Sequence, residues 1–121
     1  MKDEIKEIVT KLRKYPKVVA IILFGSTVQN KTKPLSDIDM AVITKNTDKK
    51  IEAEIASFSS NIFDVGNFHK LPLYIQFEVL KYGKPIFIKD KNYFLKVKME
   101  VLKNYLEMSS FYERMSKRIL S

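Results

Sequence analysis

The stretch Val18–Phe24 constrains the fold of this chain more than any other part of the sequence. It is an unbroken apolar run, rich in β-branched side chains and far too short to cross a bilayer. Such a run is typical of a strand buried on both faces, so the fold must place other elements on each side of it. Gly25 and Ser26 follow directly and turn the chain.

The rest of the pattern predicts further strands and helices around this strand. The apolar spacing predicts helices over 2–14, from about 49 to 58, over 69–82 and from about 91 to 120, and strands over 37–44, 62–68 and 85–88. Asn46, Thr47 and Asp48 offer caps for the second helix, Asp90 is expected to cap the last one, and Gly83 is expected just beyond the end of the third. We therefore expect a single α/β (α+β) domain over residues 1–121, with a small sheet of about four strands and a long C-terminal helix.

The final helix carries more apolar and aromatic residues than one helix face needs. Its apolar residues at helical spacing are Leu95, Met99, Leu102, Leu106, Phe111, Met115 and Ile119, and its aromatic residues are Tyr93, Phe94, Tyr105, Phe111 and Tyr112. We expect the aromatic side chains to cover the core of the domain. The alternative is a surface for a partner protein or for self-association into a homo-oligomer.

The net charge of +8 is unevenly distributed along the chain. Residues 1–80 hold 12 basic and 10 acidic residues, whereas residues 81–121 hold 10 basic and 4 acidic residues. A solvated, lysine-rich surface is the simplest explanation, and a nucleic-acid or phosphate-rich partner is the alternative. The sequence has no cysteine and no apolar signal core behind its charged N-terminus, which favours a cytoplasmic protein and excludes disulfides and zinc–thiolate sites.

Three aspartates lie in strands that are expected to be buried. Asp37 and Asp39 alternate with Ile38 and Met40, so both carboxylates face the same side of their strand. Two neighbouring carboxylates repel each other, and a hard divalent cation between them would remove that repulsion. Asp64 adds a third carboxylate within an apolar stretch of the next strand. Three carboxylates in this arrangement are what two-metal phosphoryl transfer requires.

Each motif also has an ordinary structural explanation when taken alone. Gly-Ser turns are common, and an Asp-x-Asp sequence can cap a helix or form a turn. A glycine turn between a strand and a helix start nevertheless presents backbone N–H groups to an anion, and Gly25 lets a phosphate approach closely. Aspartate is also depleted in strands, so the combination favours phosphate and metal binding. His69, the single histidine, is expected at the surface near a helix start, without a catalytic role.

These motifs together resemble those of the minimal nucleotidyltransferases, which are small stand-alone members of the DNA polymerase beta-like superfamily. The resemblance covers most of the chain and rests on three stretches, Leu23-Phe24-Gly25-Ser26, Asp37-Ile38-Asp39-Met40-Ala41-Val42 and Phe63-Asp64-Val65. It implies the nucleotidyltransferase fold with a small mixed sheet flanked by helices. It also implies that the turn binds the triphosphate of ATP, and that the three aspartates are catalytic and bind two Mg²⁺ ions. The residues concerned are Gly25 and Ser26 for the nucleotide and Asp37, Asp39 and Asp64 for the metal, with Asp64 as the general base.

The resemblance further implies a biological role. Family members of this size are commonly antitoxins that transfer AMP to a tyrosine of an all-helical HEPN ribonuclease toxin encoded next door. We therefore expect Mg²⁺-dependent transfer of AMP from ATP to a protein hydroxyl, with no membrane partner and only an indirect link to nucleic acid. The chain departs from the family at residues 27–30, where members often carry an Arg-Ala-Arg-Gly-like stretch, and Lys31 and Lys33 are the nearest substitutes. The alternative is a weak or inactive nucleotide-binding module that neutralises its partner by direct binding.

Overall fold

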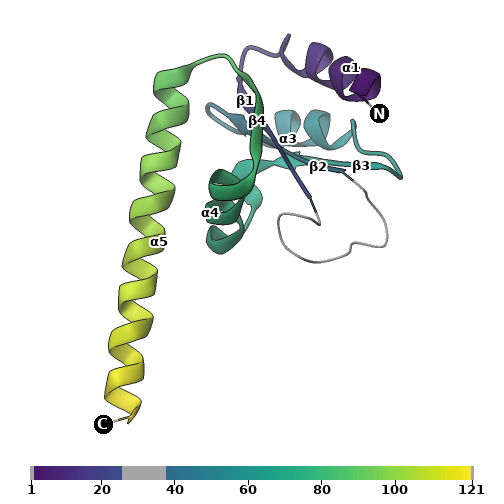
Figure 1. Ribbon diagram of the computed structural model, residues 1–121. Coiled ribbons are helices and arrows are strands. Elements are labelled where there is room, and N and C mark those ends of the chain that lie inside the picture. The colour runs from purple at the N-terminus through teal and green to yellow at the C-terminus, as the bar shows by residue number, and fades with distance from the viewer. Residues whose placement is uncertain (1, 26–37, 121) are drawn as a thin grey trace.

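A computed structural model of the chain contains a four-stranded sheet with helices on both faces (Figure 1). The structure describes residues 2–25 and 38–120. Within these ranges the elements are α1 (Lys2–Leu12), β1 (Val18–Phe24), β2 (Ile38–Thr44), α3 (Lys49–Ala56), β3 (Phe63–Asn67), the 3₁₀ helix η1 (Phe68–Lys70), α4 (Leu73–Tyr82), β4 (Lys84–Ile88) and α5 (Lys91–Leu120). The predicted α/β (α+β) class, the number of strands and the long C-terminal helix are confirmed.

The sheet is mixed and has the strand order β3-β2-β1-β4. β1 pairs antiparallel with both β2 and β4, whereas β2 and β3 are parallel. β1 therefore lies inside the sheet, and its side chains are buried except for Leu23, which is partly exposed. This position explains the unbroken apolar run, because a strand covered on both faces has no polar side to alternate with.

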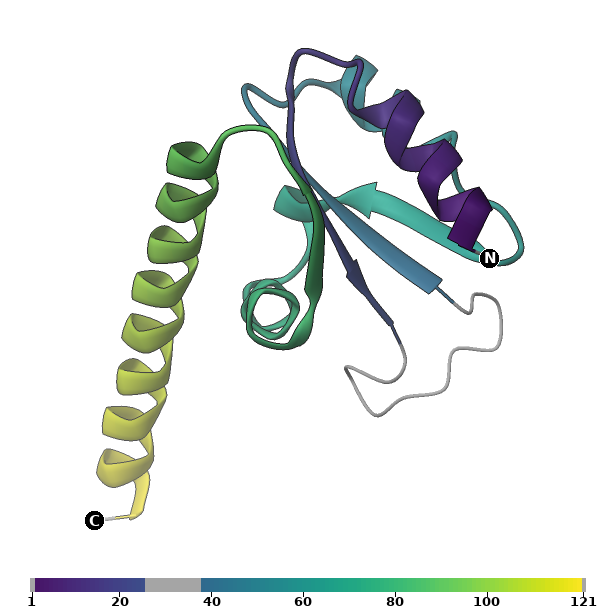
Figure 2. The same cartoon turned by 45° about the horizontal axis from the view of Figure 1, so that its top comes forward.

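Two helical layers sandwich the sheet (Figures 1 and 2). On one face, Met40 and Val42 of β2 pack in a cluster with residues of α1 and α3. On the other face, Ala41 and Ile43 pack in a cluster with residues of α4 and α5. The alternation along β2 places Asp39 on the α4 face and its neighbours on the opposite face, as the sequence predicts.

Aspartates begin two of the helices. Asp48 is the cap among the three candidates at 46–48, and Asp90 is the cap that was predicted. Asp48 Oδ1 accepts a hydrogen bond from the Ile51 N–H at 2.8 Å, and Asp90 Oδ1 accepts one from the Tyr93 N–H at 3.0 Å. The side chain of Lys17 lies 2.7 Å from Asp48 Oδ2 and lowers the pKa of that carboxyl below its usual value. Lys45 lies 2.9 Å from Asp90 Oδ2 and lowers the pKa of Asp90 in the same way. Both caps are therefore ionised at neutral pH.

Three helices have boundaries that differ from the prediction. α3 ends at Ala56 and not at about residue 58. α1 ends at Leu12 and not at residue 14, because the Tyr15 N–H bonds to the Leu12 carbonyl at 3.1 Å and tightens the last turn. The helix predicted over 69–82 is divided into η1 and α4. Pro72, with φ −57° and ψ 152°, is extended, so α4 begins only at Leu73.

Gly83 follows α4 as predicted, but it is not in the left-handed conformation that a glycine after a helix often adopts. Its φ and ψ are −71° and 160°, which any residue can adopt. A Cβ at this position would instead overlap the Val79 carbonyl oxygen and lie 2.6 Å from Ile22 Cγ2. Glycine is required here by the close packing of α4 against β1.

One side of α5 faces the core. Phe94, Val97 and Val101 are buried, and the Tyr105 ring stacks on Phe77 with centroids 3.9 Å apart. The apolar residues predicted to form the helical stripe are largely exposed, namely Leu95, Met99, Leu102, Leu106, Phe111 and Met115, while the side chain of Ile119 lies outside the described residues.

The expectation that the aromatic residues of α5 cover the core is correct for its first half and wrong for Phe111 and Tyr112. These two side chains are 52% and 63% exposed. The reason is length, because α5 has 30 residues and extends well past the sheet and α4 (Figure 1). No helix among residues 2–25 and 38–120 is long and apolar enough to cross a membrane.

Candidate active site

A row of three side chains crosses the sheet near the end of β1. The antiparallel register places Phe24 of β1 opposite Asp39 of β2, and the parallel register places Asp39 beside Asp64 of β3. Neighbouring strands are about 4.8 Å apart, so the two carboxylates share one face within reach of a common ligand. The prediction that Asp64 would lie on the strand next to Asp39 is confirmed.

The two aspartates differ in their access to solvent. Asp39 is 1% exposed, whereas Asp64 is exposed. A buried carboxylate next to a second carboxylate is unfavourable for folding unless positive charge offsets it. Carboxylate oxygens are the ligands that Mg²⁺ prefers, so the donor set fits the metal that the motifs imply. This arrangement indicates a site selected for chemistry rather than for stability.

The other predicted site residues are placed only in part. Gly25 is buried and lies directly after Phe24 at the end of β1, next to the row of side chains. Ser26, Asp37 and the lysines of the following loop lie outside the described residues. Within residues 2–25 and 38–120 there is no group of three or more histidine, cysteine, aspartate or glutamate side chains that could hold a metal ion.

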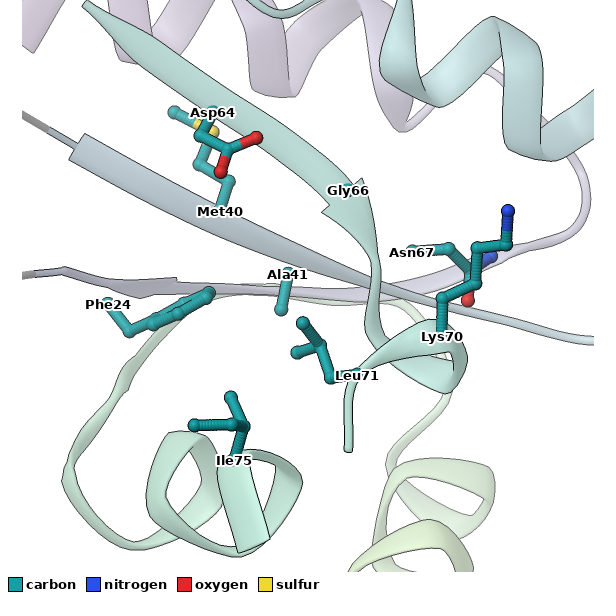
Figure 3. Close-up of a pocket in the computed structure, with 9 residues that line it drawn as sticks. All are labelled: Phe24, Met40, Ala41, Asp64, Gly66, Asn67, Lys70, Leu71 and Ile75. Atoms are coloured by element: carbon teal, nitrogen blue, oxygen red, sulfur yellow. The ribbon is translucent and has the colours of Figure 1, made fainter. Parts of the chain in front are cut away.

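A pocket of about 310 Å³ opens beside Asp64, between the sheet and α4 (Figure 3). Its apolar wall includes Phe24, Leu71 and Ile75, and its polar lining includes Asp64, Asn67 and Lys70. Sequence reasoning assigned no site role to most of these residues. Gly66, a glycine inside a strand, is the one signal that could have indicated a close approach of a ligand.

Gly66 forms part of the pocket floor. A Cβ built at this position would have no heavy atom within 4 Å, so the space above it is open. Lys70 is directed away from that space toward α3, where its Nζ lies 3.2 Å from Glu52 Oε2. The pocket is therefore mostly apolar, with the Asp64 carboxylate near one end (Figure 3).

Asn67 connects the far ends of β2 and β3. Its side-chain amide donates to Thr44 Oγ1 at 3.1 Å, and its carbonyl oxygen accepts from the His69 N–H at 2.8 Å. Asn67 and Thr44 are both buried, so these bonds satisfy groups that water does not reach. The bonds fix η1, which forms one wall of the pocket, against the sheet. Sequence reasoning did not identify this connection.

His69 is exposed, as predicted, but it lies in η1 and not in an α-helix. Its Nε2 atom lies 3.0 Å from the Thr44 carbonyl oxygen. Partial burial of the ring lowers the pKa of His69, although the bond to Thr44 and the charge of Glu100 oppose that shift. His69 is exposed as a residue, and its hydrogen bond to Thr44 lies in a partly buried position, so desolvation still acts on the ring.

Comparison with known proteins agrees with this geometry. The sequence model of the family described as "Polymerase beta, Nucleotidyltransferase" matches residues 6–92. A protein of Methanocaldococcus jannaschii, provisionally named a protein adenylyltransferase, is 31% identical over 103 residues, which cover 85% of this chain and 76% of that protein.

Chains from crystal structures of toxin–antitoxin complexes have the same fold. One chain of the MntA–HepT complex has a TM-score of 0.69 at 19% identity, covering 100% of both chains. One chain of a Shewanella oneidensis complex between a tri-AMPylated HEPN toxin and an MNT antitoxin has a TM-score of 0.66 at 19% identity, covering 99% of this chain and 98% of that chain. A chain of a toxin–antitoxin with AMP-PNP has a TM-score of 0.64 at 19% identity, covering 98% of both.

Proposed function

Because this chain belongs to the polymerase beta nucleotidyltransferase family, we propose that it transfers AMP from ATP to a hydroxyl group of a protein acceptor. The observation that carries the proposal is the pairing of Asp39 with Asp64 on the sheet face beside Gly25. A turn that can bind phosphate next to two carboxylates is suited to a metal-bound triphosphate. The name of the Methanocaldococcus relative supports adenylyl transfer to protein.

The residues of the site have separate roles in this proposal. Gly25 and Ser26 bind the triphosphate through backbone N–H groups and the serine hydroxyl. Asp37, Asp39 and Asp64 would hold two Mg²⁺ ions, and these would supply positive charge beside the triphosphate. Asp64 is more accessible to solvent than Asp39, and it accepts the proton of the attacking hydroxyl. Little else is required of the protein, because phosphoryl transfer depends mainly on positioning and electrostatic stabilisation.

The acceptor in this proposal is a tyrosine of a HEPN-type toxin encoded beside this gene, and the transfer neutralises that toxin. Its support is the fold shared with chains of toxin–antitoxin complexes, one of which contains an AMPylated HEPN toxin and another AMP-PNP. The test is incubation of the purified chain with α-labelled ATP, Mg²⁺ and the neighbouring gene product. Label should appear on that product and should be absent when Asp39→Asn replaces the unchanged chain.

A second candidate function is neutralisation of the same HEPN-type toxin by direct binding, with a weak or inactive nucleotide site. The exposed apolar side chains on the distal half of α5 favour it, since Leu106, Phe111 and Tyr112 are each more than half exposed. Arg114 and Arg118 lie close to Phe111 and Met115 and add positive charge. If the Asp39→Asn variant still neutralises the toxin and Phe111→Ser does not, direct binding is the function. The proposed AMP transfer predicts the opposite result: Asp39→Asn does not neutralise the toxin, and Phe111→Ser does.

A further inference from the structure

The pocket beside Asp64 has a position that suits one reactant in particular. We propose that this pocket receives the aromatic ring of the acceptor tyrosine and holds its phenolic oxygen near the Asp64 carboxylate. This inference rests on the proposed adenylyl transfer and adds where the acceptor binds. It concerns residues in the described part of the chain, mainly Gly66, Leu71 and Ile75.

The order of the strands determines from which side the acceptor approaches. In-line displacement at phosphorus places the attacking and leaving oxygens on opposite sides of the reacting atom. Gly25 follows β1, so a triphosphate bound there, as proposed above, would have its pyrophosphate at the β1 end of the row. Asp39 is on β2, in the middle of the row, and Asp64 is on β3 at the other side. The attacking hydroxyl must therefore come from the β3 side, where Asp64 and Gly66 line the pocket.

The lining of the pocket matches an aromatic ring better than it matches a polar group. Leu71 and Ile75 from the α4 side and Phe24 from β1 provide apolar surface, and Asp64 lies near one end (Figure 3). Gly66 leaves open space above the sheet, because no atom lies within 4 Å of where its Cβ would be. An apolar cavity with one carboxylate near its end can hold a phenol with its ring covered and its hydroxyl near that carboxylate.

The chemical step in this arrangement is balanced. The phenolic oxygen forms a bond to the α-phosphorus of ATP while the bond from that phosphorus to the bridging oxygen of the β-phosphate breaks. Pyrophosphate leaves with the electron pair, and the phenolic proton passes to the Asp64 carboxylate and then to solvent. The products are tyrosine O-AMP and pyrophosphate, and no oxidant or reductant takes part.

Binding of p-cresol, followed by NMR of the isotopically labelled full chain, tests the assignment without any need for transfer. We expect p-cresol to shift the Gly66 amide signal and the Leu71 and Ile75 methyl signals. Gly66→Leu, which fills the open space, should abolish these shifts and leave the affinity for Mg²⁺-ATP within about twofold. Ala53→Leu introduces the same side chain at an exposed position on α3. It should change neither the p-cresol shifts nor the affinity for Mg²⁺-ATP. Gly66→Ala adds only one methyl group and should reduce the p-cresol shifts without abolishing them. This variant replaces Gly66→Leu in the test if the leucine variant does not fold.

Kinetics with the HEPN-type partner separate this inference from the proposed function. Gly66→Leu should lower kcat/KM for the partner at least about tenfold and leave KM for ATP nearly unchanged. If p-cresol does not shift these signals, or if Mg²⁺-ATP shifts them and Gly66→Leu weakens ATP binding, the pocket does not hold the acceptor. If Gly66→Leu transfers AMP at the normal rate, the pocket assignment is wrong, but the proposed function still stands. Absence of transfer by the unchanged chain would instead overturn the proposed function.

Discussion

Asp39 of β2 and Asp64 of β3 are paired in parallel register, so their carboxylates lie next to each other on the α4 face of the sheet. One of them is buried and the other is exposed at the pocket. This pairing brings together residues that are 25 positions apart in the sequence, immediately beside the turn at Gly25. Like charges in such an arrangement do not help folding, so the stability of the site should depend on a cation.

Replacing Asp64 should impair transfer without harming the fold. Asp64→Asn removes the proposed proton acceptor, and we expect kcat for AMP transfer to fall by about 10²–10⁴-fold. Stability should be unchanged or higher, because the side chain is exposed and a repulsion with Asp39 is removed. Initial rates and urea denaturation measure the two effects. Glu107→Gln, an exposed position on α5, is the matched control, and equal rates for both variants would contradict the role of Asp64.

Magnesium should stabilise the unchanged chain through Asp39. Binding of a ligand to the folded state alone raises its stability by RT ln(1 + [L]/Kd), so Tm should increase with Mg²⁺ concentration. Asp39→Asn removes one of the proposed metal ligands. The same variant should respond little to Mg²⁺. An equal Mg²⁺ response of both proteins in calorimetry would argue against Asp39 as a ligand.

The sequence predicts much of this site because its signals are local. Alternation along β2 places Asp39 opposite to Met40, and the apolar neighbours of Asp64 predict its strand. The pairing of β2 with β3 supplies the rest, and parallel pairing of consecutive strands agrees with the helix between them. The alternation of side chains along a strand predicts which face Asp39 and Asp64 occupy, because their apolar neighbours must face the core.

The sequence does not predict the pocket or the exposed stripe of α5. The pocket depends on where η1 and α4 lie relative to the sheet, and Asn67 and Pro72 determine this through bonds and backbone geometry that have no periodic signal. The buried side of α5 was not identified because two apolar stripes follow nearly the same helical period. Contacts with α4 and the sheet select the stripe of Phe94, Val97 and Val101. Only tertiary packing makes that choice.

Asn67 should be important for stability. Asn67→Ala removes the hydrogen bond to Thr44 and the bond that begins η1, and it leaves buried polar groups without partners. We expect the free energy of unfolding to decrease by about 1–3 kcal/mol, measured by urea denaturation. Asn61→Ala, at an exposed position before β3, should change it by less than about 0.5 kcal/mol. Similar values for the two variants would mean that the Asn67 bonds contribute little.

His69 should make stability depend on pH near neutrality. Its pKa in the folded state is below 6.5, so between that pKa and 6.5 the unfolded chain binds more protons than the folded chain. The contribution of His69 to the free energy of unfolding is therefore fully present above pH 6.5. It is lost as the pH falls through the pKa of the folded state. Asp48 and Asp90 act in a lower range, because their folded pKa values lie below 3.8 and their contributions are lost only as the pH falls through those values. Urea midpoints between pH 5 and 8 should rise with pH for the unchanged chain and should be flatter for His69→Gln, and equal slopes would contradict this account.

Intact mass spectrometry of the HEPN-type partner is the most direct test of the central claim. The partner is co-expressed with either the unchanged chain or Asp39→Asn, and its mass is measured after purification. Our account predicts that the partner gains the mass of one or more AMP groups on tyrosine with the unchanged chain and gains none with the variant. An unmodified partner that is nevertheless neutralised by both proteins would contradict adenylyl transfer as the function of this chain.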